Sequence, residues 1–311
     1  MKSKKSRTAQ APHFAFELNT QKNLGQHFLA DTRVIADIEY AAATSLPAGS
    51  AKRCLEIGPG SGALTKQLLA KKWDVLAIEK DERAVDGLVK TLGIEFPDSF
   101  RVVQSDILKF TEINSVESSE NRPLCVGNLP YYITSDILFW FCEQAEHFGA
   151  AVFMIQDEVA DRLNAKPGTK AYGRLTVRMQ LACDVEKLFT VPAKAFVPPP
   201  KVNSAVIRLT PKKFGFENAA HEKHFSAFTA TLFSARRKML RRALANELAL
   251  YEQRTGQNAE AFWAEAAKHN VMPETRPDAI APEAIWALQT FFWKAREVTV
   301  QISGAQILNK D

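Results

Sequence analysis

Short apolar runs alternate with longer amphipathic stretches along the first half of the chain. Between residues 53 and 156 the apolar runs are CLEIG, VLAIE, FRVVQSD, PLCVGN and AAVFMIQ, and segments such as GALTKQLLAKK and DERAVDGLVKTL separate them. Because these runs are apolar throughout rather than alternating, they are typical of strands that are covered on both faces. The pattern therefore predicts an α/β fold built from βαβ units around a mostly parallel sheet.

The pattern changes after Gln156. A helix-rich part comes first, and two further predicted strands, DVEKLFTVP and KVNSAVIRLTPKK, follow it and are joined by AKAFVPPP. From about Glu217 onward the chain is predicted to be wholly helical. We therefore expect a basic N-terminal arm over residues 1–20, a sheet domain over residues 21–213 and a helical domain over residues 214–311.

Composition and charge narrow the class of protein. The 311 residues include 40 Lys plus Arg and 35 Asp plus Glu, and the resulting net charge of +5 mildly favours a polyanionic partner. The four cysteines form no CxxC pair, which argues against a disulfide framework and a zinc site and fits a reducing cytoplasm. The N-terminal sequence has charge but no apolar signal-peptide core, and no apolar run approaches the ~18 residues of a membrane span. We expect a soluble cytoplasmic protein without a bound metal.

Three predicted strands end in residues that suit a nucleoside. The first runs into EIGPGSGALT, where Gly58, Gly60 and Gly62 allow a tight turn and let a ligand lie against the backbone. Glu79 closes the second strand, 21 positions after Gly58, where a carboxylate can accept hydrogen bonds from ribose hydroxyls. Asp106 closes the third strand and can accept from an exocyclic amine such as that of adenine, or simply cap a turn. Together these strand ends predict a nucleoside pocket.

A fourth predicted strand ends in NLPYY, which has two interpretations. In the first, Asn128 is a turn residue and Pro130 begins a helix. In the second, the Asn128 side-chain carbonyl and a neighbouring backbone carbonyl are two acceptors that converge on one amino group.

Eight motifs in order resemble those of the ribosomal RNA adenine dimethyltransferases, and within that family the members that act on the small subunit. The motifs are NLGQHFL, EIGPGSGALT, IEKD, SDIL, NLPYYIT, KAYGRLTV, AFVPPPKVNSAV and RRKMLRRAL. They cover nearly the whole chain, except the basic tail before about residue 21 and the last fifteen or so residues. The resemblance implies a Rossmann-like class I methyltransferase sheet with a small all-helical C-terminal domain.

The resemblance also implies a cofactor and its contacts. The cofactor is S-adenosylmethionine, and the implied binding residues are His27, Leu29, Gly58, Gly60, Glu79, Asp106 and Asn128. Glu79 takes the ribose hydroxyls and Asp106 the adenine amine. Many relatives have Asn where this chain has His27, so a contact there would use a backbone atom or a ring nitrogen.

The catalytic residues implied by the resemblance are Asn128, Leu129, Pro130, Tyr131 and Phe196. The amino nitrogen of adenine is a poor nucleophile because its lone pair is delocalised into the ring. If Asn128 and the carbonyl of Leu129 or Pro130 accept its two protons, the lone pair can aim at the methyl group. Tyr131 then supplies one flat wall for the adenine and Phe196 the opposite wall.

RNA binding is predicted for a basic helix face. On a helical wheel of the segment from Phe228 to Leu244, four cations fall on one side and apolar residues, including Met239, on the other. The four cations are Arg237, Lys238, Arg241 and Arg242. They suit contact with phosphates, and the lysines and arginine of the first seven residues offer a second contact.

The first reading is therefore dimethylation of two adjacent adenosines near the 3′ end of small-subunit rRNA, on an assembling ribosomal particle, by a monomer. One alternative is a large-subunit rRNA methyltransferase of the macrolide-resistance type. A DNA adenine methyltransferase is disfavoured, because such enzymes usually carry an acidic residue or serine where this chain has Asn128. A different class of alternative is a mainly non-catalytic ribosome assembly factor on a retained methyltransferase fold.

Overall fold

The computed structural model describes residues 14–16, 27–111, 113 and 122–308 and divides into two units. The predicted N-terminal arm and its cations lie outside the described residues, apart from residues 14–16. The first unit joins the chain up to Ala160 to Asp184–Pro211, and the second joins Asp161–Cys183 to the chain from Lys212 onward. The chain leaves the first unit for the last time after Pro211. Residues 161–183, however, pack with the C-terminal helices, where Tyr172 donates a buried hydrogen bond to the carbonyl of Ile280.

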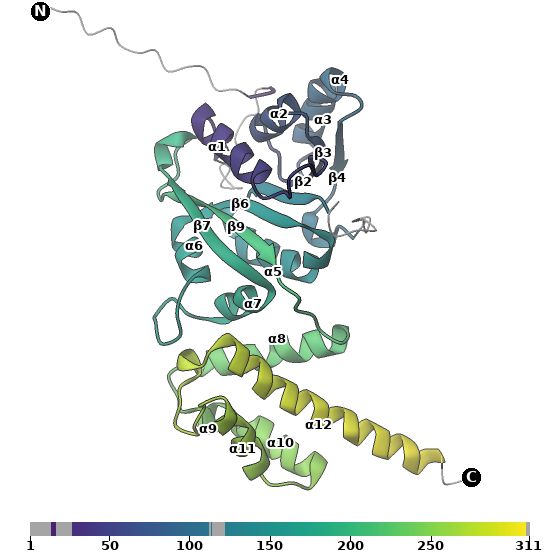
Figure 1. Cartoon of the computed structure of the whole chain (residues 1–311), viewed down its shortest axis with the longest axis vertical. Coiled ribbons are helices and arrows are strands. Elements are labelled where there is room, and N and C mark those ends of the chain that lie inside the picture. Colours follow the sequence, from purple (N-terminus) through teal and green to yellow (C-terminus); the bar gives the residue numbers. More distant parts are fainter. Residues whose placement is uncertain (1–13, 17–26, 112, 114–121, 309–311) are drawn as a thin grey trace, which may run out of the picture. The chain divides into compact units, whose positions relative to one another are not determined.

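The first unit contains a seven-stranded sheet (Figure 1). Its strands, in the order in which they lie side by side, are β4 (Phe100–Gln104), β3 (Asp74–Glu79), β2 (Arg53–Ile57), β5 (Leu124–Asn128), β6 (Ala150–Gln156), β9 (Ser204–Pro211) and β7 (Cys183–Val191). Strands β4 to β6 pair in parallel, and β9 runs antiparallel to β6. The predicted, mostly parallel α/β fold is confirmed. The strand order reverses between β2 and β5, and ligands bind at such a switch point in open sheets.

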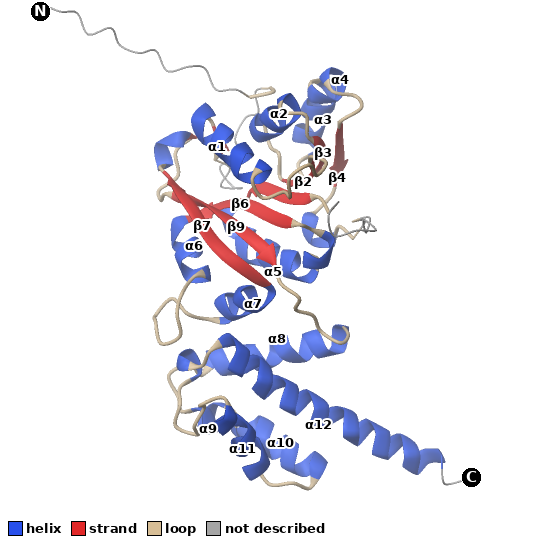
Figure 2. Ribbon diagram, in the orientation of Figure 1, coloured by secondary structure: helices blue, strands red, loops and turns tan. Residues whose placement is uncertain are grey.

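Helices cover both faces of this sheet (Figure 2). They are α1 (Thr32–Ala43), α2 (Ala63–Ala70), α3 (Glu82–Lys90), α4 (Leu92–Glu95), α5 (Thr134–Glu143) and α6 (Asp157–Leu163). Successive strand residues serve opposite faces: Val152 packs in the core with helices α1 to α3, whereas Phe153 meets Phe141 of α5 edge to face at 5.6 Å. Burial on both sides explains why the sequences of the central strands β2, β5 and β6 are mainly apolar.

A short second sheet joins distant parts of the chain. It pairs β1 (Phe28–Leu29) with β8 (Phe196–Val197) in antiparallel fashion. The backbone N–H of Ala30 extends the pairing by donating to the carbonyl of Ala195. The segment before α1 is therefore held against the proline-rich connector that follows β7.

The second unit is helical, as predicted. Its helices are α7 (Arg174–Ala182), α8 (Ala219–Ser234), α9 (Leu240–Ala243), α10 (Ala245–Thr255), α11 (Glu260–Lys268) and α12 (Pro282–Leu308). Aromatic rings fill its core, with Phe262 and Phe292 stacked at 4.7 Å. The ring of His221 stacks on Trp293 at 4.8 Å. Among the described residues, no helix combines the length and apolar character needed to cross a membrane.

The prediction of a single helix between Phe228 and Leu244 is wrong. Helix α8 ends at Ser234, and α9 restarts only at Leu240. The backbone N–H of Leu240 donates to the carbonyl of Thr275, and that of Arg241 to Pro273, instead of continuing a helix. As a result Met239, which the wheel placed on the apolar side, is 39% exposed.

Candidate active site

A cavity of about 480 Å³ opens in the first unit at the carboxyl ends of β2, β3 and β5. The predicted residues that line it are His27, Leu29, Gly58, Gly60, Glu79, Asp106, Asn128, Leu129, Pro130 and Tyr131. The structure therefore brings together every predicted cofactor residue and four of the five predicted catalytic residues. Their placement follows from the parallel sheet, which collects the ends of separate strands at one edge.

The glycine loop leaves backbone open to this cavity. Gly58 has a φ of 63°, in the left-handed region, and a Cβ placed on it would meet no atom within 4 Å. Its N–H donates to the carbonyl of Ile78 in β3, which fixes the loop to the neighbouring strand end. A left-handed glycine that faces open space lets a ligand lie directly against the main chain.

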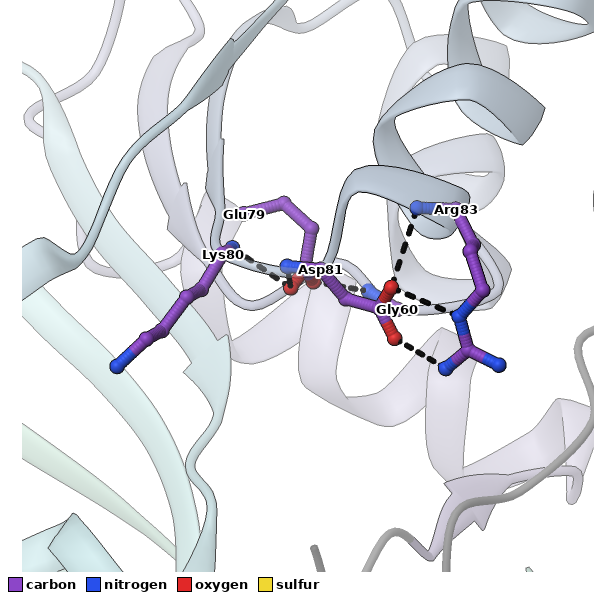
Figure 3. A network of polar contacts seen from close by, with 5 residues as sticks. All are labelled: Gly60, Glu79, Lys80, Asp81 and Arg83. Atoms are coloured by element: carbon purple, nitrogen blue, oxygen red, sulfur yellow. Dashed lines mark hydrogen bonds and ion pairs between the residues drawn. The ribbon is translucent and has the colours of Figure 1, made fainter.

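The Glu79 carboxylate is held by three backbone N–H groups (Figure 3). Its Oε1 accepts from Lys80 at 2.7 Å and from Asp81 at 2.8 Å, and its Oε2 accepts from Gly60 at 3.1 Å. Burial raises the pKa of Glu79, although these three hydrogen bonds act in the opposite direction. Asp81 caps α3 through the N–H of Arg83 and also pairs with that guanidinium. Strand end, glycine loop and helix start are thereby locked around one carboxylate.

A second carboxyl group, that of Glu56, is buried near Glu79, and the sequence analysis did not identify it. Glu56 in β2 is only 2% exposed. Burial raises the pKa of Glu56 to about 8, and the negative charge of Glu79 adds to the rise. The signal was present in the sequence as an acidic residue inside the apolar run CLEIG.

Asp106 takes the capping role that the sequence allowed and also makes an ion pair. It caps the short 3₁₀ helix Ile107–Lys109 by accepting from the N–H of Leu108 at 3.1 Å. Its Oδ2 also pairs with the Lys80 ammonium at 2.9 Å, and that hydrogen bond is the main reason why its pKa is lowered. Asp106 is thus a fixed, ionised acceptor on the wall of the cavity.

The turn after β5 orients the Asn128 amide. Gly127 lies so close to β2 that a Cβ would come within 2.8 Å of the Ile57 carbonyl oxygen, which allows Asn128 its position at the strand end. The Asn128 amide nitrogen donates to the backbone carbonyl of His27 at 3.3 Å. A carbonyl can only accept, so the contacting atom is Nδ2, and Oδ1 is left as a hydrogen-bond acceptor.

The backbone carbonyls of Leu129 and Pro130 differ in the hydrogen bonds that they accept. The carbonyl of Pro130 accepts from the Thr134 hydroxyl at 2.9 Å and from the N–H of Ile133 at 3.2 Å. Both of its lone pairs are therefore used within the turn. The Leu129 N–H donates to the carbonyl of Met154 in β6, and this hydrogen bond holds the backbone of Leu129 in place. Of the two carbonyls named in the sequence analysis, that of Leu129 is the better placed acceptor.

Tyr131 is held through its hydroxyl and lies near the ring of His27. Its hydroxyl lies 2.8 Å from the hydroxyl of Ser204 in β9, and its ring lies 5.8 Å from that of His27. Burial raises the pKa of Tyr131 and the hydrogen bond with Ser204 lowers it in part. Ser204 is fully buried and was not singled out in the sequence, although it stands inside the motif AFVPPPKVNSAV.

The remaining predicted residues lie elsewhere. Phe196 is only 2% exposed, packs in the core of the first unit and is not a lining residue of the cavity. In the second unit, Arg237, Lys238 and Arg242 are exposed, and so is Arg241, which pairs with Glu274 at 3.2 Å.

The neighbouring Arg236 makes its polar contacts within the second unit. It pairs with Asp278 and donates to the carbonyls of Thr169 and Lys170. In the described part of the chain, no cluster of three or more His, Cys, Asp or Glu side chains is placed to hold a metal ion.

Comparison with known proteins identifies relatives over most of the chain. Residues 17–275 match the model of the family described as ribosomal RNA adenine dimethylase. A protein named ribosomal RNA small subunit methyltransferase A from Dichelobacter nodosus is 42% identical over 232 residues, which is 74% of this chain and 84% of the relative. The protein of the same name from Geobacillus thermodenitrificans is 40% identical over 232 residues, or 73% of this chain and 77% of the relative.

Two solved structures are similar to this chain over most of its length. A dimethyladenosine transferase from Plasmodium falciparum has a TM-score of 0.70 and 28% identity, and the match covers 86% of this chain and 98% of that one. The 23S rRNA methyltransferase ErmE has a TM-score of 0.57 and 27% identity, and the match covers 85% of this chain and 98% of the other.

Proposed function

Because this chain belongs to the ribosomal RNA adenine dimethylase family, we propose that it transfers methyl groups to N6 of two adjacent adenosines near the 3′ end of small-subunit rRNA. The observation that carries the chemistry is the orientation of Asn128, whose amide N–H is taken by the His27 carbonyl. Its Oδ1 and the Leu129 carbonyl then remain as two acceptors for the two protons of an adenine amine. The relatives named for the small subunit support that substrate over the large-subunit alternative.

The cavity fits S-adenosylmethionine as the methyl donor. When bound, this cofactor supplies an electrophilic methyl group on a cationic sulfonium. Gly58 offers bare backbone, the immobilised Glu79 carboxylate suits ribose hydroxyls, and Asp106 suits the adenine amine. Carboxylates near the site also favour a cation.

The residues around Asn128 act by orientation and electrostatics. When Oδ1 of Asn128 and the Leu129 carbonyl accept its protons, the target nitrogen is held with its lone pair free of the ring, which raises its nucleophilicity. Tyr131, fixed by Ser204, supplies a flat surface for the adenine, and stacking of this kind contributes roughly 1–3 kcal/mol per base. After the first transfer one N–H remains, so the same acceptors can hold the base for the second.

RNA contact outside the pocket is proposed for the exposed cations of the second unit. Arg237, Lys238 and Arg242 can neutralise phosphates at the surface, as can Arg241 if it leaves Glu274. We further propose that the protein acts as a monomer, in the cytoplasm, on a small-subunit particle that is still being assembled.

The test is methyl transfer from labelled S-adenosylmethionine to small subunits that lack the modification, with the product mapped by mass spectrometry. We expect dimethyladenosine at two neighbouring positions near the 3′ end, lost in Asn128→Ala and retained in Asn246→Ala, which changes an exposed asparagine of the second unit. Methylation of large-subunit RNA alone would contradict the proposal in favour of the resistance-type enzymes. Transfer to neither RNA, with particle binding intact, would favour the assembly-factor alternative.

A further inference from the structure

His27 connects two segments that lie far from it in the sequence. Its ring Nδ1 lies 2.8 Å from the carbonyl oxygen of Pro198, 171 positions away. Its own backbone carbonyl accepts the Asn128 amide N–H, 101 positions away. A single residue before the first long helix therefore contacts both the proline-rich connector and the NLPY turn.

The partner of the His27 ring shows which of its nitrogens carries the hydrogen. The Pro198 carbonyl can only accept, so Nδ1 of His27 carries the hydrogen and donates it. The same ring lies 5.8 Å from the ring of Tyr131, with the two planes inclined by 34°. Nδ1 of His27 is thus engaged with the connector, while its ring lies near Tyr131, the wall proposed for the target base.

The surrounding backbone makes the connection rigid. Phe28 pairs with Val197 and Leu29 with Phe196, so the residue after His27 and the residue before Pro198 are already neighbours in a sheet. The hydrogen bond from His27 extends that pairing by one step, from backbone to side chain. Loops are positioned well when they are tied at several points to fixed elements.

We propose that His27 is a positioning residue of the target-base pocket, and that Nδ1 of its ring serves the connector rather than the cofactor. Its ring holds the connector from Phe196 to Pro200 in place, and its carbonyl sets the orientation of Asn128. This inference rests on the proposed methyl transfer for its kinetic consequence, but the link between His27 and the connector is independent of any substrate.

The test separates the hydrogen bond from the ring. His27→Phe keeps a flat ring beside Tyr131 but removes the donor, whereas His27→Gln restores an N–H donor on a side chain of similar reach. His147→Phe is the matched control, since His147 lies in the first unit away from the cavity. Three quantities are measured: hydrogen–deuterium exchange of residues 195–203, the Kd for S-adenosylhomocysteine, and the single-turnover rate at saturating methyl donor and small subunits.

We expect His27→Phe to speed exchange in the connector and to lower the single-turnover rate about 3- to 10-fold, the range of one lost hydrogen bond. The Kd for S-adenosylhomocysteine should stay within about twofold of wild type. His27→Gln should recover most of the rate, and His147→Phe should match wild type in all three measurements.

Two results would overturn the inference. Exchange in the connector that is the same in wild type and His27→Phe would show that the hydrogen bond holds nothing in place. A Kd raised about tenfold or more with an unchanged saturated rate would make His27 a cofactor ligand. Failure of the proposed function is a separate outcome, because wild type would then not methylate small subunits while the exchange measurement still reports on His27.

Discussion

Replacing Glu56 by Gln should stabilise the protein at alkaline pH and leave it almost unchanged in acid. Glu56 is 2% exposed, and burial raises its pKa from 4.5 to about 8. The free-energy difference that corresponds to this change is roughly 4–5 kcal/mol at 1.36 kcal/mol per pH unit. Since whole domains are stable by only about 5–15 kcal/mol, one buried carboxyl group should be visible in unfolding experiments.

The sign follows from proton binding. The folded state holds the Glu56 proton more tightly than the unfolded state does, so the stability that the neutral carboxyl contributes is complete below about pH 4.5. It is lost progressively as the pH rises to about 8, where the folded protein must carry a buried negative charge beside Glu79. Gln has a similar shape and no charge at any pH, so it avoids this loss.

The measurement is urea unfolding of wild type and Glu56→Gln at a series of pH values between about 4.5 and 9. We expect the difference in unfolding free energy between variant and wild type to grow in favour of the variant by a few kcal/mol across this window. Glu95→Gln is the control, because Glu95 is an exposed glutamate of the same unit and should give a flat difference. A Glu56→Gln difference that is equally flat would refute the reasoning.

Two further predictions concern the base pocket and the RNA surface. Ser204→Ala should raise the pKa of Tyr131 further, because a hydrogen bond that lowers this pKa is lost, and tyrosinate absorbance measures the change. The same substitution should slow methyl transfer about 2- to 10-fold, and a rate equal to that of wild type would contradict this expectation. Replacing Arg237, Lys238 and Arg242 by Ala together should make the plot of log affinity for rRNA against log salt less steep by about 2, at about 0.7 per phosphate contact. An unchanged slope would exclude these cations from the RNA interface.

The fold was largely predictable because its main signal is local. The central strands β2, β5 and β6 are buried on both faces, so their sequences are mainly apolar runs, and the glycine loop and Glu79 mark strand ends directly. The helical pattern around Leu240 was misleading for a reason that the local sequence does not contain. The backbone N–H groups of Leu240 and Arg241 find partners at Thr275 and Pro273, which no periodicity of the 228–244 segment can indicate.

The site was predictable as a set of residues but not as a network. Strand topology gathers the ends of β2, β3 and β5, and this explains why residues chosen from separate motifs line one cavity. The partners that orient them, His27 for Asn128 and Ser204 for Tyr131, are 101 and 73 positions away. Phe196 was expected at the pocket wall, but its pairing with Leu29 places it in the core.

The proposed cofactor and the proposed RNA make opposite electrostatic demands, and the chain meets them in different places. A cationic sulfonium is favoured by carboxylates, and Glu79 supplies one in the cavity, where burial limits the screening of its charge. A polyanion is favoured by exposed cations such as Arg237 and Lys238, whose effect beyond about 8 Å is screened at physiological salt. It follows that changes at the carboxylates should alter cofactor affinity with little dependence on salt, whereas changes at the cations should alter RNA affinity in a strongly salt-dependent way.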